Sequence, residues 1–393
     1  DVVALKEPDR VPNYTAMSGV IIDYARVTHA DMFYNAKKSI KAFVKFQADF
    51  EPEYTLGAMA MPGRSLDMVG YNVCRWPGSS RANALPDNIP FQYVEGEYMP
   101  AEDYDELIRN PEGYILRKYI PRIFDHLKGF ENLPTLFNLT SIYGVGMVLT
   151  PFGIGEFRES IKLILKAADK VMEDMLPAFI VSAHITNQWG APSLFGGISY
   201  APFDIIGNTL RGTKGIMLDM FRRPDKVLAA CEAMIPIAIK MASEGPAMTG
   251  NPYIYMPLHK GADGFMSNKQ FSKFYWPSLK AVFEGLIKEG FIAMPFVEGK
   301  YDQRLDIIAE SGLPKARTVW IFDQTNMKMA KEKFGNWACI GGNVPASLFC
   351  AGTPQEMDDY CKKLIDTLAP GGGYFLAPGA ILDHATADNL RAY

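Results

Sequence analysis

From residue 253 to the end, the hydrophobic pattern of the chain alternates between short apolar runs and longer amphipathic segments. The apolar runs predict strands at residues 253–257, 291–297, 318–322, 339–341 and 374–377. The amphipathic segments predict helices at residues 267–288, 304–310, 326–334 and 353–368, the last capped by Thr353 with Pro354 in its first turn. Strands that alternate with helices are typical of βα units and a parallel sheet. Five short strands in strict succession fit a closed (β/α)₈ TIM barrel better than an open sheet.

Before residue 253 the pattern is less regular. Helical spacing is present at residues 30–49, 103–109, 114–127, 157–188 (with a break expected near Pro177) and 224–243. Apolar runs at residues 56–61 and 135–139 are strand candidates. A Gly- and Pro-rich tract at residues 62–100 is too long for an ordinary connection, so we expect an ordered insertion near the active-site mouth. With no repeat and no low-complexity linker, residues 1–393 are expected to form one α/β barrel with an N-terminal extension and this insertion.

Composition excludes several classes of function. The chain has 40 basic and 44 acidic residues with a net charge of −4 and no basic run, so nucleic acid is not an expected partner. Its longest apolar stretches are too short to span a membrane. It has five cysteines without a Cys-x-x-Cys pair and starts without a signal-peptide pattern, which favours a cytoplasmic protein with reduced thiols.

Polar residues follow the predicted strands where barrel enzymes carry their chemistry. His259, Glu298, Asp323 and Asn343 each come after a different strand and are our candidate catalytic residues. Together His, Glu and Asp can act as general acid and base or hold Zn²⁺, so His259, Glu298 and Asp323 are also a candidate metal site. The alternative is that each residue only caps a helix or closes a loop salt bridge.

Motifs of the other common enzyme classes are missing: the sequence has no phosphate-binding loop, no His-Glu-x-x-His and no Gly-x-Ser-x-Gly. Some of the 20 methionines could line an apolar pocket, although packing in the core is the more frequent role of methionine.

Several segments of the C-terminal half resemble the uroporphyrinogen decarboxylase superfamily. They are Pro295-Phe-Val-Glu-Gly-Lys-Tyr-Asp-Gln-Arg-Leu, Ile340-Gly-Gly-Asn-Val-Pro-Ala-Ser-Leu, Gly352-Thr-Pro-Gln-Glu-Met, Gly379 and Ala387-Asp-Asn-Leu-Arg-Ala. The resemblance is specific from about residue 253 and looser upstream, where Lys6-Glu-Pro-Asp-Arg-Val-Pro is similar to the family's opening. It implies a (β/α)₈ barrel and either porphyrinogen decarboxylation or corrinoid-linked methyl transfer.

The decarboxylase branch carries Arg-Gln-Ala-Gly-Arg near its N-terminus, where the arginines grip substrate carboxylates. The corresponding Ala60-Met-Pro-Gly-Arg64 keeps only the last two residues. A substrate with eight carboxylates needs several arginines, so uroporphyrinogen is not the expected substrate.

The thiol-methylating branch holds Zn²⁺ through His-x-Cys-Gly and a later Gly-Cys. Here these positions are Phe296-Val-Glu298-Gly299 and Gly379-Ala380, without thiolates. The resemblance therefore does not imply a sulfur-activating zinc site, although a hard-ligand zinc site on Glu298 with His259 or Asp323 stays compatible with the sequence.

The remaining pattern is similar to the branch that demethylates methoxylated aromatics. That branch passes the methyl group to the cobalt of a cobalamin-type corrinoid, which a separate corrinoid protein carries. Co(I) is already a strong nucleophile, so the enzyme must activate the leaving oxygen by protonation or by a Lewis-acid metal. A flat apolar donor suits the aromatic- and Met-rich tract from Met59 to Tyr98. We expect Met59, Met61, Arg64, Tyr93 and Tyr301 to bind substrate.

Two other classes stay open. A decarboxylase or lyase acting on a smaller acid would need carboxylate anchors, for which Arg64, Arg75 and Arg304 are the obvious candidates. A non-catalytic binding protein would have solvated and mutually distant rim residues. Barrel enzymes often form homodimers, but no face for one is visible in the sequence.

Overall fold

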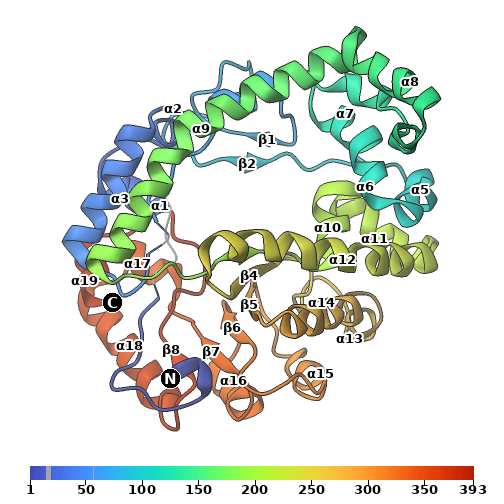
Figure 1. The fold of residues 1–393 in the computed structure, drawn as a ribbon. Coiled ribbons are helices and arrows are strands. Elements are labelled where there is room, and N and C mark those ends of the chain that lie inside the picture. Colours follow the sequence, from blue (N-terminus) through green and yellow to red (C-terminus); the bar gives the residue numbers. More distant parts are fainter. Residues whose placement is uncertain (15–18, 56) are drawn as a thin grey trace.

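A six-stranded parallel sheet forms the centre of the computed structural model, which describes residues 1–14, 19–55 and 57–393 (Figure 1). Its strands pair in chain order, and every pair is parallel. They are β3 (Gly197–Ile198), β4 (Tyr253–Leu258), β5 (Ile292–Val297), β6 (Val319–Phe322), β7 (Cys339–Gly341) and β8 (Tyr374–Phe375). The five strands predicted after residue 253 are confirmed, with ends shifted by at most two residues.

Two single bridges extend this sheet at its edges. Asn13 pairs with Leu376 beside β8, and Thr55 pairs with Ser193 beside β3, both in parallel. Eight extended segments thus follow one another in the order of a (β/α)₈ barrel, as predicted. Among the described residues, the two edge segments are joined by a side chain: the Asn13 N–H donates to Glu53 Oε2 at 2.9 Å, and Arg10 pairs with Glu53 at 2.7 Å. We call this junction the seam.

Helices connect the strands and cover the outside of the sheet (Figure 1). After β3 come α10 (Pro202–Ile205), η6 (Ile206–Leu210), α11 (Gly212–Arg222) and α12 (Pro224–Thr249). After β4 come α13 (Asn268–Gln270), η7 (Phe271–Tyr275) and α14 (Trp276–Lys288). The later strands are followed by α15 (Leu305–Ala309), α16 (Met327–Phe334), α17 (Ala346–Ala351), α18 (Pro354–Leu368) and α19 (Ala387–Ala392). Thr353 caps α18 with a capping box to Glu356, as its sequence predicts.

The N-terminal half supplies helices and a small hairpin. Its helices are η1 (Val2–Ala4), α1 (Gly19–Tyr24), α2 (His29–Tyr34), α3 (Ala36–Phe50), α4 (Gly63–Val69), η2 (Ala101–Asp103), α5 (Tyr104–Arg109), α6 (Pro111–Tyr114), η3 (Ile115–Tyr119), α7 (Ile120–Ile123), η4 (Lys128–Asn132) and η5 (Leu136–Thr140). Within the 62–100 tract, β1 (Cys74–Arg75) and β2 (Gln92–Tyr93) pair antiparallel. The helix predicted at 30–49 is divided, because Asn35 ends α2 and caps α3 by accepting from the Lys38 N–H.

Two strand predictions in this half did not hold as made. The apolar run at 135–139 is wrong as a strand: it forms the exposed turn η5 and leads into α8 (Ile142–Gly153). No sheet edge lies beside it among the described residues, and apolar content alone does not distinguish a strand from a helical turn. Of the strand predicted at 56–61, Leu56 lies outside the described residues, and residues 57–61 form neither strand nor helix.

The longest helix, α9 (Gly155–Trp189), has 35 residues and is therefore about 52 Å long. It crosses one side of the molecule from α8 at one end to the region of α3 at the other (Figure 1). The amphipathic pattern at 157–188 predicts this helix, but the break expected near Pro177 is wrong, because Pro177 lies inside one continuous helix. No helix in the described part of the chain is both long and apolar enough to cross a membrane.

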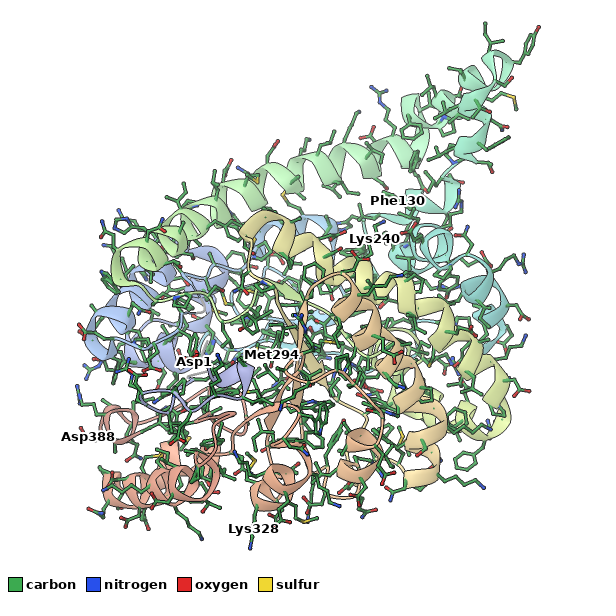
Figure 2. The ribbon with its side chains drawn as sticks, turned by 60° about the horizontal axis from the view of Figure 1, so that its bottom comes forward. Asp1, Phe130, Lys240, Met294, Lys328 and Asp388 are labelled. Carbon is green, nitrogen blue, oxygen red and sulfur yellow. The ribbon has the colours of Figure 1, made fainter. Side chains whose placement is uncertain are left out.

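Two apolar layers hold the barrel together. Inside it lies a cluster that includes Tyr14, Met294, Phe296, Ile321 and Phe375, with Met294 at the centre of Figure 2. Outside the sheet, the Trp320 side chain points toward the helices and is fully buried. Its ring centroid lies 6.4 Å from that of Trp276, 5.6 Å from Phe283 and 5.4 Å from Phe334, so one strand residue binds helices α14 and α16.

Replacement of this side chain should destabilise the whole barrel. We expect Trp320→Ala to lower the free energy of unfolding by about 3–5 kcal/mol, because it removes a large buried ring from between two helices. Urea denaturation monitored by circular dichroism measures the change. Phe221→Ala, at a residue 76% exposed on α11, is the control and should change stability by less than about 0.5 kcal/mol. A loss below about 1 kcal/mol for Trp320→Ala would contradict the packing described.

Candidate functional site

The four predicted catalytic residues lie at the carboxyl ends of adjacent strands. His259 follows β4, Glu298 follows β5, Asp323 follows β6 and Asn343 comes two residues after β7. Because neighbouring parallel strands end at the same edge, these residues share one rim of the sheet. The closest pair is His259 and Glu298, whose Nε2 and Oε1 atoms are 3.5 Å apart.

The second ring nitrogen of His259 has its own partner. The Asn208 side-chain nitrogen on η6 lies 2.6 Å from His259 Nδ1. An amide N–H in that position donates to Nδ1, which leaves the proton of a neutral ring on Nε2 and directs it toward Glu298. Asn208 thus selects the tautomer that faces the carboxylate. It was not among the predicted residues, because it follows no sheet strand directly.

Asp204 on α10 fixes the loop that carries His259. Its carboxylate is fully buried and accepts the N–H groups of His259 and Lys260, each at 3.0 Å, and the hydroxyl of Tyr275 at 2.7 Å. Burial raises the pKa of Asp204. The charges of His259 and Lys260 and the hydrogen bonds from Tyr275 and the His259 N–H oppose that effect in part. The sequence does carry a signal for this residue: an acidic side chain inside the otherwise apolar segment Ala201-Pro-Phe-Asp-Ile-Ile.

Lys260 brings a cation to the same cluster. Its side chain is 8% exposed, and its Nζ donates to Thr213 Oγ1 at 3.0 Å. The stem passes directly over Gly207, where a Cβ would lie 2.7 Å from Lys260 Cε. Burial lowers the pKa of Lys260, and Asp204, Glu95 and Glu298 raise it in smaller measure. Lys260 is thus a partly desolvated ammonium group within the electrostatic range of Glu298.

The 62–100 insertion reaches this cluster through its last residues. Glu95 accepts the N–H of Thr213 at 2.6 Å, next to the hydroxyl that binds Lys260. Nearby, the buried Arg211 donates to Asp219 at 2.6 Å and pairs with Glu97. These contacts attach the end of the insertion to η6 and α11.

The Glu298 side chain is accessible from solvent, and its pKa is shifted. Its side chain is 46% exposed, so a bound molecule can reach it. The pKa of Glu298 is raised, first by desolvation and also by the carboxylates of Asp204 and Asp323, while His259 and Lys260 lower it. A raised carboxyl pKa favours the protonated form, which is the form that can donate a proton.

Asp323 and Asn343 are held by the backbone of the rim. Asp323 Oδ2 accepts the Gly299 N–H at 3.0 Å, and burial raises the pKa of Asp323 against that hydrogen bond. The Asn343 amide donates to the carbonyl groups of Asp323 at 2.8 Å and Thr325 at 2.9 Å. Asn343 therefore braces the loop after β6, and Asp323 influences Glu298 through its charge.

The three candidate metal ligands, His259, Glu298 and Asp323, do not converge on one point. His259 and Glu298 approach each other, but within the described part of the chain no three His, Cys, Asp or Glu side chains gather as a metal site would require. The residues as placed do not match a three-ligand zinc site, and we derive no chemical step through zinc.

The predicted substrate-binding residues lie in different places. Met59 lines a cavity of about 1010 Å³ between α9 and the amino ends of β4 and β6. Met61 is half-buried against the core, and Tyr93 is exposed on β2, where its ring packs edge-on against Phe91. Tyr301 is fully buried and packs edge-on against Phe271. Among these four, only Tyr301 comes from a loop of the rim.

Two of the three arginines that could anchor a carboxylate, Arg64 and Arg304, have partners within the protein. Arg64 donates to Asp174 on α9 at 3.1 Å and lies 3.5 Å from Glu173. Arg304 is fully buried, donates to the carbonyl groups of Gly261 and Ala262 at 3.1 and 3.2 Å, and lies 3.6 Å from Asp263. Both guanidinium groups are therefore engaged in holding loops and helices.

Comparisons with known proteins agree with this architecture. A family model described as uroporphyrinogen decarboxylase (URO-D) matches residues 158–393, which is more than half of the chain. A solved structure of a methyltransferase from Methanosarcina mazei is similar over 100% of this chain and 95% of its own, with a TM-score of 0.59 and 15% sequence identity. At that identity the similarity supports the fold. A search of curated proteins found no match.

The hydrogen bonds of Asp204 generate a prediction about stability. Asp204→Asn replaces one carboxylate oxygen by an amide NH₂ group. At least one of the three groups that donate to the native carboxylate then loses its acceptor. We expect a loss of about 1–3 kcal/mol in the free energy of unfolding. The exposed Asp169→Asn on α9 is the control, with an expected change within about 0.5 kcal/mol. Equal stabilities of the two variants in chemical denaturation would refute the positioning role.

Proposed function

Because the chain belongs to the uroporphyrinogen decarboxylase (URO-D) family, we propose that it is an enzyme of the methyltransferase type within that family. In this proposal a methyl group leaves the oxygen of a small donor, such as a methoxylated aromatic, and passes to the cobalt of a corrinoid carried by a separate protein. The fold shared with a methyltransferase from Methanosarcina mazei supports the type of reaction. The donor and the acceptor are those that the resemblance of the sequence to the O-demethylating branch implies, and a general acid at the rim is compatible with them.

The observation that carries the proposal is the pair formed by His259 and Glu298. The two side chains lie 3.5 Å apart at the accessible end of the strands, and the pKa of Glu298 is raised by desolvation above all. Such a carboxyl group keeps its proton to a higher pH than an ordinary glutamate does, which suits protonation of a leaving oxygen. His259, with its Nε2 proton directed at Glu298, can restore the proton after each turnover.

In the proposed step, the bond between the methyl carbon and the donor oxygen breaks, and its electron pair stays on the oxygen. The methyl carbon is taken by the nucleophilic cobalt of the co-substrate, which supplies the electron pair of the new bond. The proton of Glu298 moves to the oxygen, so that a neutral phenol leaves in place of a phenolate. His259 then transfers a proton from solvent to Glu298.

The decarboxylase alternative is less well supported by the positions of the arginines. Such an enzyme needs cationic side chains free to bind substrate carboxylates. Arg64 and Arg304 are engaged by Asp174 and Asp263, respectively, and by neighbouring groups. Arg75, the third candidate, is exposed on β1 of the insertion.

The proposal predicts that Glu298 is essential for turnover. Glu298→Gln should lower kcat by about 10²- to 10⁴-fold, the usual contribution of a general acid, with little change in donor binding. The assay is anaerobic: a panel of methoxylated aromatics is incubated with chemically reduced cobalamin, and the loss of Co(I) absorbance and release of phenol are followed. Glu284→Gln on α14, an exposed residue paired with Lys280, is the matched control and should be fully active.

Two results would contradict this proposal. One is a Glu298→Gln variant as active as the native protein toward its methyl donor. The other is release of CO₂ from carboxylated substrates by a native protein that demethylates none of the donors.

The raised pKa of Glu298 also predicts the pH dependence of turnover. The acid form donates the proton, so kcat/KM should be constant below the pKa of Glu298 and fall as pH rises through it. Since that pKa is raised, the fall should begin above the ordinary glutamate value of about 4.3. Glu298→Gln should lack this decline. Rates measured with an aryl methyl ether that has no titrating group provide the profile, and activity that rises with pH over this range would indicate a base instead.

A further inference from the structure

An uncharged, exposed arm extends from the molecule beyond Phe130. It comprises residues 133–154, that is η5 and α8, and no Asp, Glu, Lys or Arg occurs between Glu131 and Glu156. Figure 2 shows this segment projecting away from the body of the protein at the end of α9. Within the described residues, α8 contacts η5 and α9. At the base of the arm, Arg117 on η3 donates to the carbonyl groups of Leu133 at 3.3 Å and Pro134 at 3.2 Å.

The arm exposes large apolar side chains to an unusual degree. Within α8, Gly144 and Val148 are the buried residues. The exposed fractions reach 77% for Phe137, 86% for Ile142 and 91% for Tyr143. The other exposed apolar residues of the arm are Leu136, Leu139, Met147, Leu149, Phe152 and Ile154. Apolar patches of this size on a soluble chain mark sites of interaction.

A second apolar stripe follows the outward side of α9. Leu165, Met172, Leu176 and Phe179 are all exposed and are separated by seven, four and three residues. This spacing places them on one face of the helix. A partner seated on the arm therefore has further apolar surface available along the helix to which the arm is attached.

We infer that the arm is the interface between two copies of this chain. Its exposed apolar side chains present on the order of 1,000 Å² of accessible surface, and a stable interface buries roughly 800 Å² on each partner. In a twofold dimer the same patch meets itself, so an uncharged apolar patch brings no like charges together. Homodimer interfaces are also more apolar than other interfaces.

The chemistry of the arm favours a second copy over a lipid surface. Helices that lie on membranes carry a Lys- and Arg-rich face opposite the apolar one, which binds anionic headgroups. The arm has no cationic residue on any face. Nor does it offer charges for a partner protein recognised by salt bridges.

The test is the oligomeric state of the full chain. Sedimentation equilibrium should show a dimer at micromolar concentrations. The double variant Ile142→Glu and Met147→Glu should raise the dimer Kd at least about 100-fold, because it places four carboxylates in an apolar interface. Both positions are largely exposed in the single chain, so the fold should be retained, which circular dichroism checks. Phe221→Glu adds one carboxylate per chain at a similarly exposed apolar residue of α11 and should remain dimeric.

Several outcomes would overturn the inference. A native protein that stays monomeric up to about 100 μM lacks a physiologically useful dimer, and binding of that monomer to anionic phosphatidylglycerol vesicles would assign the arm to a lipid surface instead. A native dimer whose Kd is unchanged by the double variant would place the interface elsewhere. Should the double variant fail to fold, the single change Tyr143→Lys serves the same comparison.

Discussion

The candidate site depends on one buried carboxylate. Asp204 accepts the N–H groups of two consecutive residues, His259 and Lys260, and the hydroxyl of Tyr275, so a single anion fixes the loop after β4 and the helix η7 that follows it. An isolated carboxylate in the protein interior is costly, and three donors offset that cost in part. His259 then meets both Asn208 and Glu298 in one orientation. Asp204 thus holds the site together, but we do not expect it to take part in the reaction.

The second half of the fold was predictable because its strands are apolar, bounded by turns and separated by amphipathic helices. The rim positions of His259, Glu298, Asp323 and Asn343 follow from the same pattern. The alternative considered for such residues, that they brace loops, describes Asn343 well, since its amide donates to two backbone carbonyl groups. Asp204 and Asn208 could not be placed beside His259 from the sequence, because their proximity is created by the packing of α10 and η6 against β4.

The first half was harder to predict for physical reasons. β3 has two residues and begins with Gly197, so its hydrophobic pattern is too short to detect. The apolar run at 135–139 has the composition of a buried strand, yet it is exposed in η5. Local sequence carries no information about whether a neighbouring strand exists to pair with it. The partners of Arg64 were equally hidden, because Asp174 is 110 residues away along the chain.

The seam between the edge segments makes the barrel unequal around its circumference. Elsewhere the strands are joined by backbone pairing, whereas at the seam, within the described residues, Glu53 links Asn13 and Arg10 through its side chain. Opening at this line breaks a few side-chain contacts, whereas opening between two central strands breaks a ladder. Local opening of the barrel should therefore cost the least free energy at the seam, where the barrel can widen while its other strands stay paired.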